Sequence, residues 1–396
     1  MNYECDACGY RTPKWMGFCP QCRAATGLRE VRAGRPDEAI AVLLDGAGGG
    51  GTDRFATGIG EFDRVLGGGI VPGTALLVGG EPGVGKSTLL LQVAAGLAVA
   101  GPVLVATAEE SADQVALRAD RIGIHAGELY LVAAKDIGEV IAAARRLGPR
   151  LVVLDSIQAV RSADVDGAPG GVTQVRACAD QLIGFAKESG IPVAVVGHVT
   201  KDGSIAGPKH LEHMVDVVLY LEGEDADGLR LLRGLKNRFG AVSEVGLFEM
   251  HDDGLHPAAD PSATAAGGWT GGVPGTIAFP MVEGRRSLIV EVQALVAETR
   301  SSQPRRSVKG IDAARIHQIL AVLDRHVGLG FGSLDVYVGV VGGIRVREPA
   351  ADLPVAVALA SSVLNRPAGR TAAWGEVGLT GEIRPVSLAE RRRKEA

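Results

Sequence analysis

One segment of the chain has the residue types and spacing of a phosphate-binding loop. Residues 80–88 read Gly-Glu-Pro-Gly-Val-Gly-Lys-Ser-Thr, which satisfies the pattern G-x4-G-K-[ST]. In such a loop the glycines let the backbone curl around an anion, and the amides of a helix N-terminus point toward it. The lysine neutralises the β- and γ-phosphates, and the serine ligates Mg²⁺. The segment predicts binding of a nucleoside triphosphate and Mg²⁺ through Gly80, Gly83, Val84, Gly85, Lys86, Ser87 and Thr88.

Hydrolysis also needs a second metal anchor and a group that orients water. Asp155 ends the apolar run Leu151–Leu154, which is the usual Walker B arrangement; a plain helix cap is the competing interpretation. Two carboxylates follow the run Val103–Thr107, which we expect to neighbour the loop strand. Of these, Glu109 is preferred over Glu110 as the group that holds the attacking water.

A cation for the developing charge is not obvious in the same half of the chain. The compact segment Lys236-Asn-Arg-Phe-Gly240 follows a hairpin-like pair of apolar runs, Val217–Leu221 and Leu229–Leu232. Lys236 and Arg238 are therefore candidates to reach a phosphate held by a neighbouring subunit. A solvated cluster of charges is the alternative interpretation.

Four of the five cysteines lie in the first 22 residues, as Cys5-x2-Cys8-x10-Cys19-x2-Cys22. Paired CxxC knuckles at this spacing predict a tetrahedral Zn²⁺ site. Four thiolates fill the coordination sphere, so the site is expected to be structural, with zinc binding and folding as one event. Redox exchange is the less favoured alternative. The fifth, Cys178, is expected to be a small buried residue.

The elements that must position these residues are read from apolar runs and breakers. Five strand-like runs separated by helix-length segments predict a parallel α/β sheet covered on both faces: Ala75–Val78, Val103–Thr107, Leu151–Leu154, Val193–Val196 and Val217–Leu221. Helices are expected at Thr88–Val99 and Thr173–Ser189. After Gly275, the strands Leu288–Ala294 and Asp335–Val341 and the helix Pro354–Leu364 predict a separate α+β unit.

Two breaker-rich stretches, Asp45–Asp53 and His251–Gly275, are the candidate linkers. They divide the chain into a zinc ribbon at 1–30, a P-loop domain at 50–250 and a scaffold domain at 272–396. The chain stops at 391–396 in a helix-like segment without a cap, so we expect the last domain to be truncated.

Composition limits the classes of function. The 396 residues are 46% hydrophobic and 22% charged, which excludes a largely disordered protein. The net charge of −5 means that any nucleic-acid binding must come from local basic surface. No signal peptide is apparent, and the most apolar stretch, Leu89–Ala108, is broken by Gln92 and by Gly101-Pro102. We therefore expect a soluble cytoplasmic protein without a membrane partner.

Taken together, these motifs resemble the RadA (Sms) family of bacterial DNA repair proteins, across nearly the whole chain. The resemblance is carried by the cysteines, the phosphate loop, Thr57 to Ile70 (TGIGEFDRVLGGGI), Ala108-Glu-Glu-Ser111, Leu154-Asp-Ser-Ile-Gln158, Gly197-His-Val-Thr-Lys201-Asp-Gly203 and Lys236-Asn-Arg-Phe-Gly240.

The resemblance implies a RecA-type ATPase core that forms a ring, a hexamer, on single-stranded and branched DNA. It implies ATP hydrolysis at subunit interfaces and branch migration alongside the strand-exchange recombinase. By this similarity Lys86 and Ser87 bind ATP and Mg²⁺, Asp155 is the Walker B acid, and Glu109 is the catalytic carboxylate. Lys236 and Arg238 act in trans, and the segment from His198 to Lys201 couples hydrolysis to DNA.

The third part resembles the proteolytic domain of Lon proteases, an α+β (S5-type) fold. A Ser–Lys dyad needs a serine and a neutral lysine, but Val355 and Glu390 stand where these would fall. We therefore expect a ring-forming, DNA-binding scaffold. Its basic loops are the candidate DNA contacts, with a solvated charged face as the alternative: Arg285, Arg286, Arg305, Arg306 and Lys309.

Three functional hypotheses result from this sequence. The leading one is a DNA-dependent ATP-driven motor of homologous recombination and repair. The second is a Lon-like ATP-dependent protease, which the missing dyad disfavours. The third is a scaffold that ATP switches between states without movement along DNA.

Overall fold

The computed structural model of the chain describes residues 2–5, 11–12, 16–20, 22–23, 28–31, 53–125, 127–198, 210–223, 229–266, 269, 271–299 and 303–396. They belong to two compact units, Met1–Gly51 and Thr52–Ala396. Cys8, Lys201 and residues 45–52 of the first predicted linker lie outside the described residues. For His198 only the backbone is described.

The first unit contains a small antiparallel sheet in the order β2-β1-β3. Its strands are β1 (Asn2–Cys5), β2 (Arg11–Thr12) and β3 (Leu28–Val31). Cys5 ends the central strand, and Cys19 and Cys22 belong to the turn region between β2 and β3. The structure therefore describes at least one cysteine of each predicted CxxC pair: Cys5 of the first, and Cys19 and Cys22 of the second.

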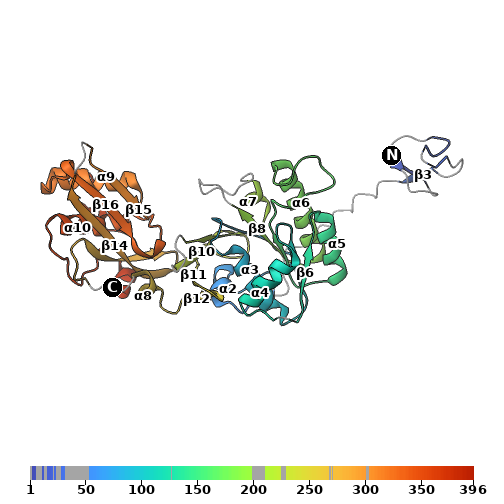
Figure 1. The fold of residues 1–396 in the computed structure, drawn as a ribbon, viewed down its shortest axis with the longest axis horizontal. Coiled ribbons are helices and arrows are strands. Elements are labelled where there is room, and N and C mark those ends of the chain that lie inside the picture. Colours follow the sequence, from blue (N-terminus) through green and yellow to red (C-terminus); the bar gives the residue numbers. More distant parts are fainter. Residues whose placement is uncertain are drawn as a thin grey trace, which may run out of the picture. The chain divides into compact units, whose positions relative to one another are not determined.

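The second unit begins with a nine-stranded sheet in the order β12-β11-β10-β9-β4-β8-β7-β5-β6 (Figure 1). The strands from β9 to β6 are parallel, and β9 to β12 form an antiparallel extension. All five predicted strands are confirmed. The nine strands are β4 (Ala75–Gly80), β5 (Val103–Thr107), β6 (Leu129–Ala133), β7 (Val152–Asp155), β8 (Val193–His198), β9 (Val217–Glu222), β10 (Leu229–Asn237), β11 (Val245–His251) and β12 (Gly254–Pro257).

Helices cover both faces of this sheet, as the continuous apolar strands predict. In β4, Leu76 packs into a core with α2, α3 and α4, whereas Leu77 packs into a second core with α5, α6 and α7. Alternate residues of a strand point to opposite faces, so each buried strand supplies both cores. The helices are α2 (Gly60–Leu66), α3 (Lys86–Ala98), α4 (Ala112–Arg121), α5 (Ile137–Leu147), α6 (Val172–Ser189) and α7 (His210–Met214).

One prediction about this sheet is wrong. The strand β5 does not neighbour the loop strand β4, because β8 and β7 lie between them. Three strand steps separate the two by roughly 14 Å. The crossover helices are long enough to skip positions in the sheet, so chain order does not determine strand order.

The C-terminal part of the second unit, residues 271–396, is an α+β fold built on a sheet in the order β13-β14-β16-β15 (Figure 1). The predicted strands and helix are confirmed. Its elements are β13 (Thr276–Glu283), β14 (Arg286–Glu298), β15 (Arg306–Lys309), α9 (Ala313–Val322), β16 (Leu334–Val340), α10 (Asp352–Val363), β17 (Glu376–Val377), β18 (Ile383–Arg384) and α11 (Ala389–Glu395). A π-helical turn (Leu323–Val327) and three 3₁₀ turns, Phe331–Ser333, Val341–Gly343 and Pro349–Ala351, join them.

The second predicted linker, His251–Gly275, is not an open linker. It contains β12 and the helix α8 (Pro261–Ala266). Leu255 and Ala265 are buried, and the Ser262 hydroxyl accepts a hydrogen bond from Ile289 N of β14 at 3.0 Å. A few apolar residues are enough to fold this proline- and alanine-rich stretch onto the surrounding core.

The C-terminal part shares a hydrophobic core with the sheet of the P-loop half. Leu231 of β10 and Leu247 of β11 pack in the same cluster as Ile277 and Phe279 of β13. Ion pairs add to this contact, including Arg286 with Glu61 at 2.7 Å and Arg233 with Glu283. A common core explains why residues 52–396 form one compact unit.

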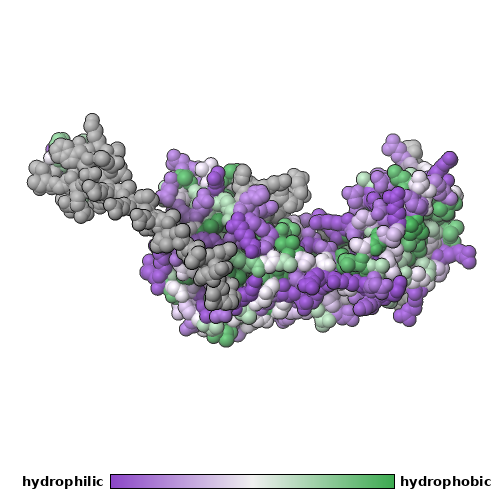
Figure 2. Space-filling model, turned by 180° about the vertical axis from the view of Figure 1, so that it is seen from behind, coloured by the Kyte–Doolittle hydropathy of each residue, from purple (hydrophilic) through white to green (hydrophobic). Residues whose placement is uncertain are grey.

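On the described residues of the face drawn in Figure 2, hydrophilic and hydrophobic side chains are interspersed. Among the helices that the structure describes, none combines the length and the apolar character needed to cross a membrane.

Candidate nucleotide and metal sites

The loop between β4 and α3 has a backbone that only glycine accommodates. Gly83 and Gly85 adopt φ values of +80° and +109°, in the left-handed region. A Cβ at Gly80 would lie 2.5 Å from Leu221 O, and one at Gly85 would lie 2.5 Å from Met250 Cε. Val84 is buried and Ser87 and Thr88 are half-buried at the helix start. The loop is a cradle of backbone amides at a helix N-terminus, which fits a phosphate group.

Lys86 points into this cradle. Its side chain is buried, and Nζ donates hydrogen bonds to Gly80 O and Glu81 O, both at 2.9 Å. Burial lowers the pKa of Lys86, and the nearby carboxylates Asp155 and Glu109 oppose that shift. A lysine held inside the loop by its carbonyls is positioned to meet the phosphates that the loop binds.

Asp155 stands at the end of β7, beside the start of α3. Burial raises the pKa of the Asp155 carboxyl, and a hydrogen bond from the Ser87 side chain and the charge of Arg118 oppose this shift. A serine hydroxyl and a carboxylate in contact are the pair of oxygen ligands that Mg²⁺ takes in a P-loop site. With Mg²⁺ bound, the metal charge would stabilise the ionised carboxylate.

The two candidate carboxylates after β5 lie in different surroundings. The Ser156 hydroxyl donates a hydrogen bond to Glu109 Oε1, so Glu109 lies next to the Walker B end of β7. Glu110 forms an ion pair with Arg118 instead. Although β5 is not adjacent to β4, Glu109 still reaches the loop region because β5 pairs with β7, Thr107 opposite Asp155.

Sequence reasoning missed Arg118. This residue of α4 pairs with Glu110, and its Nη1 lies 4.0 Å from Asp155 Oδ2. The capping box of α4, Ser111 with Gln114, is visible in the sequence as a helix start, and it fixes where Arg118 falls on the helix. Nothing in the sequence shows that this face meets the end of β7.

Lys236 and Arg238 lie at the opposite end of the sheet from the phosphate loop of their own chain. In the register, Asn237 pairs with Val217 and Val217 pairs with Leu76, near the beginning of β4. The loop follows the other end of β4, at Gly80. Lys236 Nζ donates to Glu212 O at 2.8 Å, and Arg238 Nη1 lies 3.1 Å from Asp216 Oδ1.

The metal site of the first unit rests on three described cysteines. The Sγ atoms of Cys5, Cys19 and Cys22 all lie within 4.8 Å of one another, and Cys5 Sγ is 3.6 Å from Cys22 Sγ. Thiolates on a tetrahedral Zn²⁺ lie about 3.8 Å apart, given Zn–S bonds of ~2.3 Å. The cluster fits Zn²⁺, for which Cys8 remains the predicted fourth ligand.

Two family models match separate parts of the chain, one over the cysteine ribbon and one over the P-loop half. A family model described as a rubredoxin metal binding domain matches residues 3–26, and one described as an AAA domain matches residues 52–204. The DNA repair protein RadA of Bacillus subtilis is 44% identical over 410 residues, covering 100% of this chain and 90% of that protein. RadA of Mycobacterium tuberculosis is 46% identical, covering 100% of this chain and 85% of its own. This chain belongs to the RadA family of DNA repair proteins. Among solved structures, the RadB recombinase aligns with 51% of this chain at 24% identity and a TM-score of 0.42.

In this RadA-family chain a P-loop core with a parallel sheet and an N-terminal metal-binding ribbon are both present. The P-loop ATPase half carries the ATP-binding motif between β4 and α3. The residues predicted to bind ATP lie in this loop and at the start of α3, and Asp155, the second predicted Mg²⁺ ligand, contacts Ser87 from the end of β7.

The predicted basic loops of the C-terminal part need correction in this RadA-family chain. Arg306 and Lys309 belong to the strand β15, not to a loop. The Arg306 guanidinium donates to Phe331 O at 2.7 Å and to Leu334 O, which gives it a structural role. Arg305 precedes the strand and is exposed. Arg286 is engaged by Glu61, and Arg285 lies 3.2 Å from Glu244.

Removing the metal is expected to unfold the ribbon and leave the second unit folded, because so short a segment has little core of its own. We expect a chelator to release one Zn²⁺ per chain and to expose the cysteines of the ribbon to thiol reagents. Cys22→Ser should lose zinc even without chelator. Cys178→Ala is the matched control: Cys178 is fully buried, and burial raises its pKa to about 11. Stoichiometric zinc in Cys22→Ser would contradict the assignment.

Proposed function

We propose that this chain is a DNA-dependent ATPase of homologous recombination and DNA repair. In this proposal it assembles into a ring, a hexamer, hydrolyses ATP between neighbouring copies, and uses hydrolysis to move along single-stranded and branched DNA. It thereby drives branch migration with the strand-exchange recombinase. The family membership and the P-loop ATPase fold support the broad function, and the geometry of the sheet supports the shared site.

The observation that carries the proposal is the distance between the phosphate loop and the cations Lys236 and Arg238 of the same chain. The strand β4 runs from Ala75 to Gly80, a length of roughly 17 Å. The phosphate loop follows one end, and Lys236 and Arg238 lie at the other. A chain cannot apply these cations to its own ATP, but a copy stacked head to tail can, which is the geometry of a ring with repeated interfaces.

Each residue then has a definite part in the reaction. Lys86 neutralises the phosphates, Ser87 and Asp155 hold Mg²⁺, and Glu109 orients the attacking water. The neighbour's Lys236 and Arg238 stabilise the charge that develops as the γ-phosphate leaves, as an arginine finger does. His198 and Lys201 are the proposed link to DNA at the end of β8, and Arg305 and Lys309 are proposed contacts in the C-terminal part.

In this proposal the C-terminal part is a scaffold and not a protease. Val355 is fully buried within α10, and Glu390 is exposed at the start of α11. Neither side chain can serve as the nucleophile or the amine base of a Ser–Lys dyad.

The proposal is tested by ATPase turnover of the zinc-loaded chain with and without single-stranded DNA. We expect DNA to raise kcat several-fold, and we expect turnover per chain to fall on dilution as the ring dissociates. Double-stranded DNA without a junction serves as the comparison substrate. Equal turnover by an isolated monomer, indifferent to DNA, would overturn the proposal. A branched DNA substrate then distinguishes a motor, which moves the junction, from an ATP-switched scaffold, which only binds it.

A further inference from the structure

A buried carboxylate holds the cationic turn in place. Asp216 lies between α7 and β9, and its side chain is 4% exposed. Its Oδ1 accepts a hydrogen bond from Arg238 Nη1 at 3.1 Å, and Oδ2 accepts from Lys187 Nζ at 2.5 Å and from Ala75 N at 3.0 Å. Its backbone carbonyl accepts from Arg238 N at 3.1 Å. Asp216 therefore binds Arg238 through hydrogen bonds to both its side chain and its backbone.

The charge on this carboxylate is well stabilised. Burial by itself raises the pKa of Asp216, but hydrogen bonds from Ala75 N, Lys187 and Arg238 outweigh it, and the pKa lies below its usual value. Ionised Asp216 offers Arg238 a fixed partner near neutral pH. Arg238 itself is 52% exposed, so the guanidinium is oriented without being buried.

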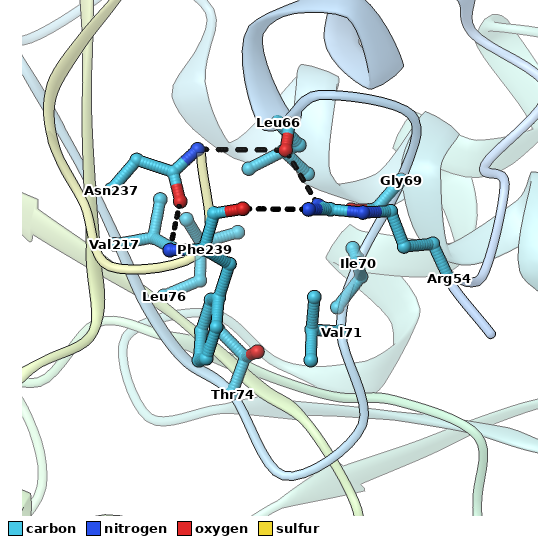
Figure 3. Close-up of a pocket in the computed structure, with 10 residues that line it drawn as sticks. All are labelled: Arg54, Leu66, Gly69, Ile70, Val71, Thr74, Leu76, Val217, Asn237 and Phe239. Atoms are coloured by element: carbon cyan, nitrogen blue, oxygen red, sulfur yellow. Dashed lines mark hydrogen bonds between the residues drawn. The ribbon is translucent and has the colours of Figure 1, made fainter. Parts of the chain in front are cut away.

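The rest of the turn is held by hydrogen bonds between side chains and the backbone, which Figure 3 shows. Arg54 donates to Phe239 O and to Leu66 O, both at 2.8 Å. The Asn237 side chain accepts a hydrogen bond from Phe239 N at 2.9 Å. These bonds fix the path of the main chain around residue 238, and Asp216 fixes the direction of its side chain.

Asp216 also touches the strand that leads to the phosphate loop. Besides the bond from Ala75 N to its carboxylate, Asp216 N donates to Ala75 O at 2.9 Å. Ala75 begins β4, and Gly80 ends β4 where the loop starts. One buried residue is thus bonded both to the strand that carries the chain's own ATP loop and to the arginine that it offers to its neighbour.

We propose that Asp216 is a positioning residue for the trans-acting cations: it orients Arg238 for ATP hydrolysis at the neighbouring copy's loop and ties that orientation to strand β4 of its own chain. This inference rests on the proposed function. Asp216 touches neither ATP nor metal in this scheme, and acts through Arg238. Its loss should therefore affect turnover at the neighbour's site and spare ATP binding at its own.

The test uses Asp216→Asn, which keeps the shape and removes the charge. We expect kcat to fall at least tenfold while the KM for ATP stays within about twofold. Glu188→Gln is the matched control, because Glu188 lies next to Lys187 and its exposed side chain pairs with Arg145 at 3.2 Å. That variant should keep the kcat of the unmodified chain.

Mixing with Lys86→Ala chains separates a trans role from a merely structural one. An Asp216→Asn chain has an intact loop, and a Lys86→Ala chain has intact cations, so mixed assemblies should regain part of the lost activity. Absence of recovery, when Arg238→Ala mixed with Lys86→Ala does recover, would overturn the inference and leave the proposed function standing. If Arg238→Ala shows no recovery either, the proposed function itself fails.

A second variant covers the case in which Asp216→Asn does not fold. Asp216→Glu keeps the charge but moves the carboxylate by one methylene. We expect the same pattern, a lowered kcat that mixing with Lys86→Ala restores, and an unchanged KM for ATP. A kcat equal to that of the unmodified chain in a folded variant would overturn the inference.

Discussion

Replacement of Lys86 by alanine is expected to weaken ATP binding by about 100-fold, equivalent to about 2.7 kcal/mol, the loss of strong charge-assisted hydrogen bonds to phosphate. Lys86 is buried in the loop, where the charges of Asp155 and Glu109 act on it, and its loss would remove the loop's own cation from beside these carboxylates. The Gly80 and Glu81 carbonyls would also lose their donor. Calorimetric titration with Mg²⁺ and a non-hydrolysable ATP analogue measures the effect.

The matched control for this change is Lys135→Ala. Lys135 is an exposed lysine of the same half of the chain, so its loss tests whether any lysine deletion weakens binding through net charge alone. We expect that variant to bind the analogue as the unmodified chain does. Retention of tight binding by Lys86→Ala would mean that residues 80–88 are not the ATP loop.

Replacement of Arg238 by alanine is expected to lower kcat by about 1,000-fold, the lower range for removal of an arginine finger. ATP affinity should stay within about twofold, because Arg238 lies at the end of the sheet opposite to its own loop. Steady-state turnover with single-stranded DNA, together with analogue binding, measures both quantities. Equal losses of binding and turnover would place Arg238 in its own nucleotide site and contradict action across an interface.

Mixed assemblies make that prediction sharper. In a random equal mixture of Arg238→Ala and Lys86→Ala chains, about one head-to-tail interface in four joins a competent loop to a competent cation. Two chains that are each inactive should then hydrolyse ATP together. A mixture that stays inactive at every ratio would argue against trans action.

The phosphate loop and the strands around it could be predicted because their signals are local. Glycine, lysine and serine at 80–88 follow an apolar run and open a helix, and each requirement is met within a few residues. The ends of β5 and β7 are equally local signals, so the sequence identifies Glu109 and Asp155 as candidates, although it does not show how close they lie. The CxxC spacing of the ribbon is local in the same sense.

The contacts that bring distant segments together could not be predicted in this way. Arg118 lies near Asp155, and Asp216 forms hydrogen bonds with both Arg238 and Ala75. These contacts join elements that are far apart in the chain. The sheet order places β8 and β7 between β5 and β4, which reversed an expectation drawn from chain order. The segment 251–275 is folded because its few apolar residues pack against a core that other segments supply.

The amino-acid sequence by itself determined the chemistry that this chain can perform: a triphosphate cradle, a metal-anchoring carboxylate, a set of thiolates and a turn rich in cations. Only the tertiary structure decided where these groups stand, with the cradle at one end of β4 and the cations at the other. The physical reason is that residue type and local conformation are set within a few neighbours, whereas the order of strands is set by burial of apolar faces over the whole sheet.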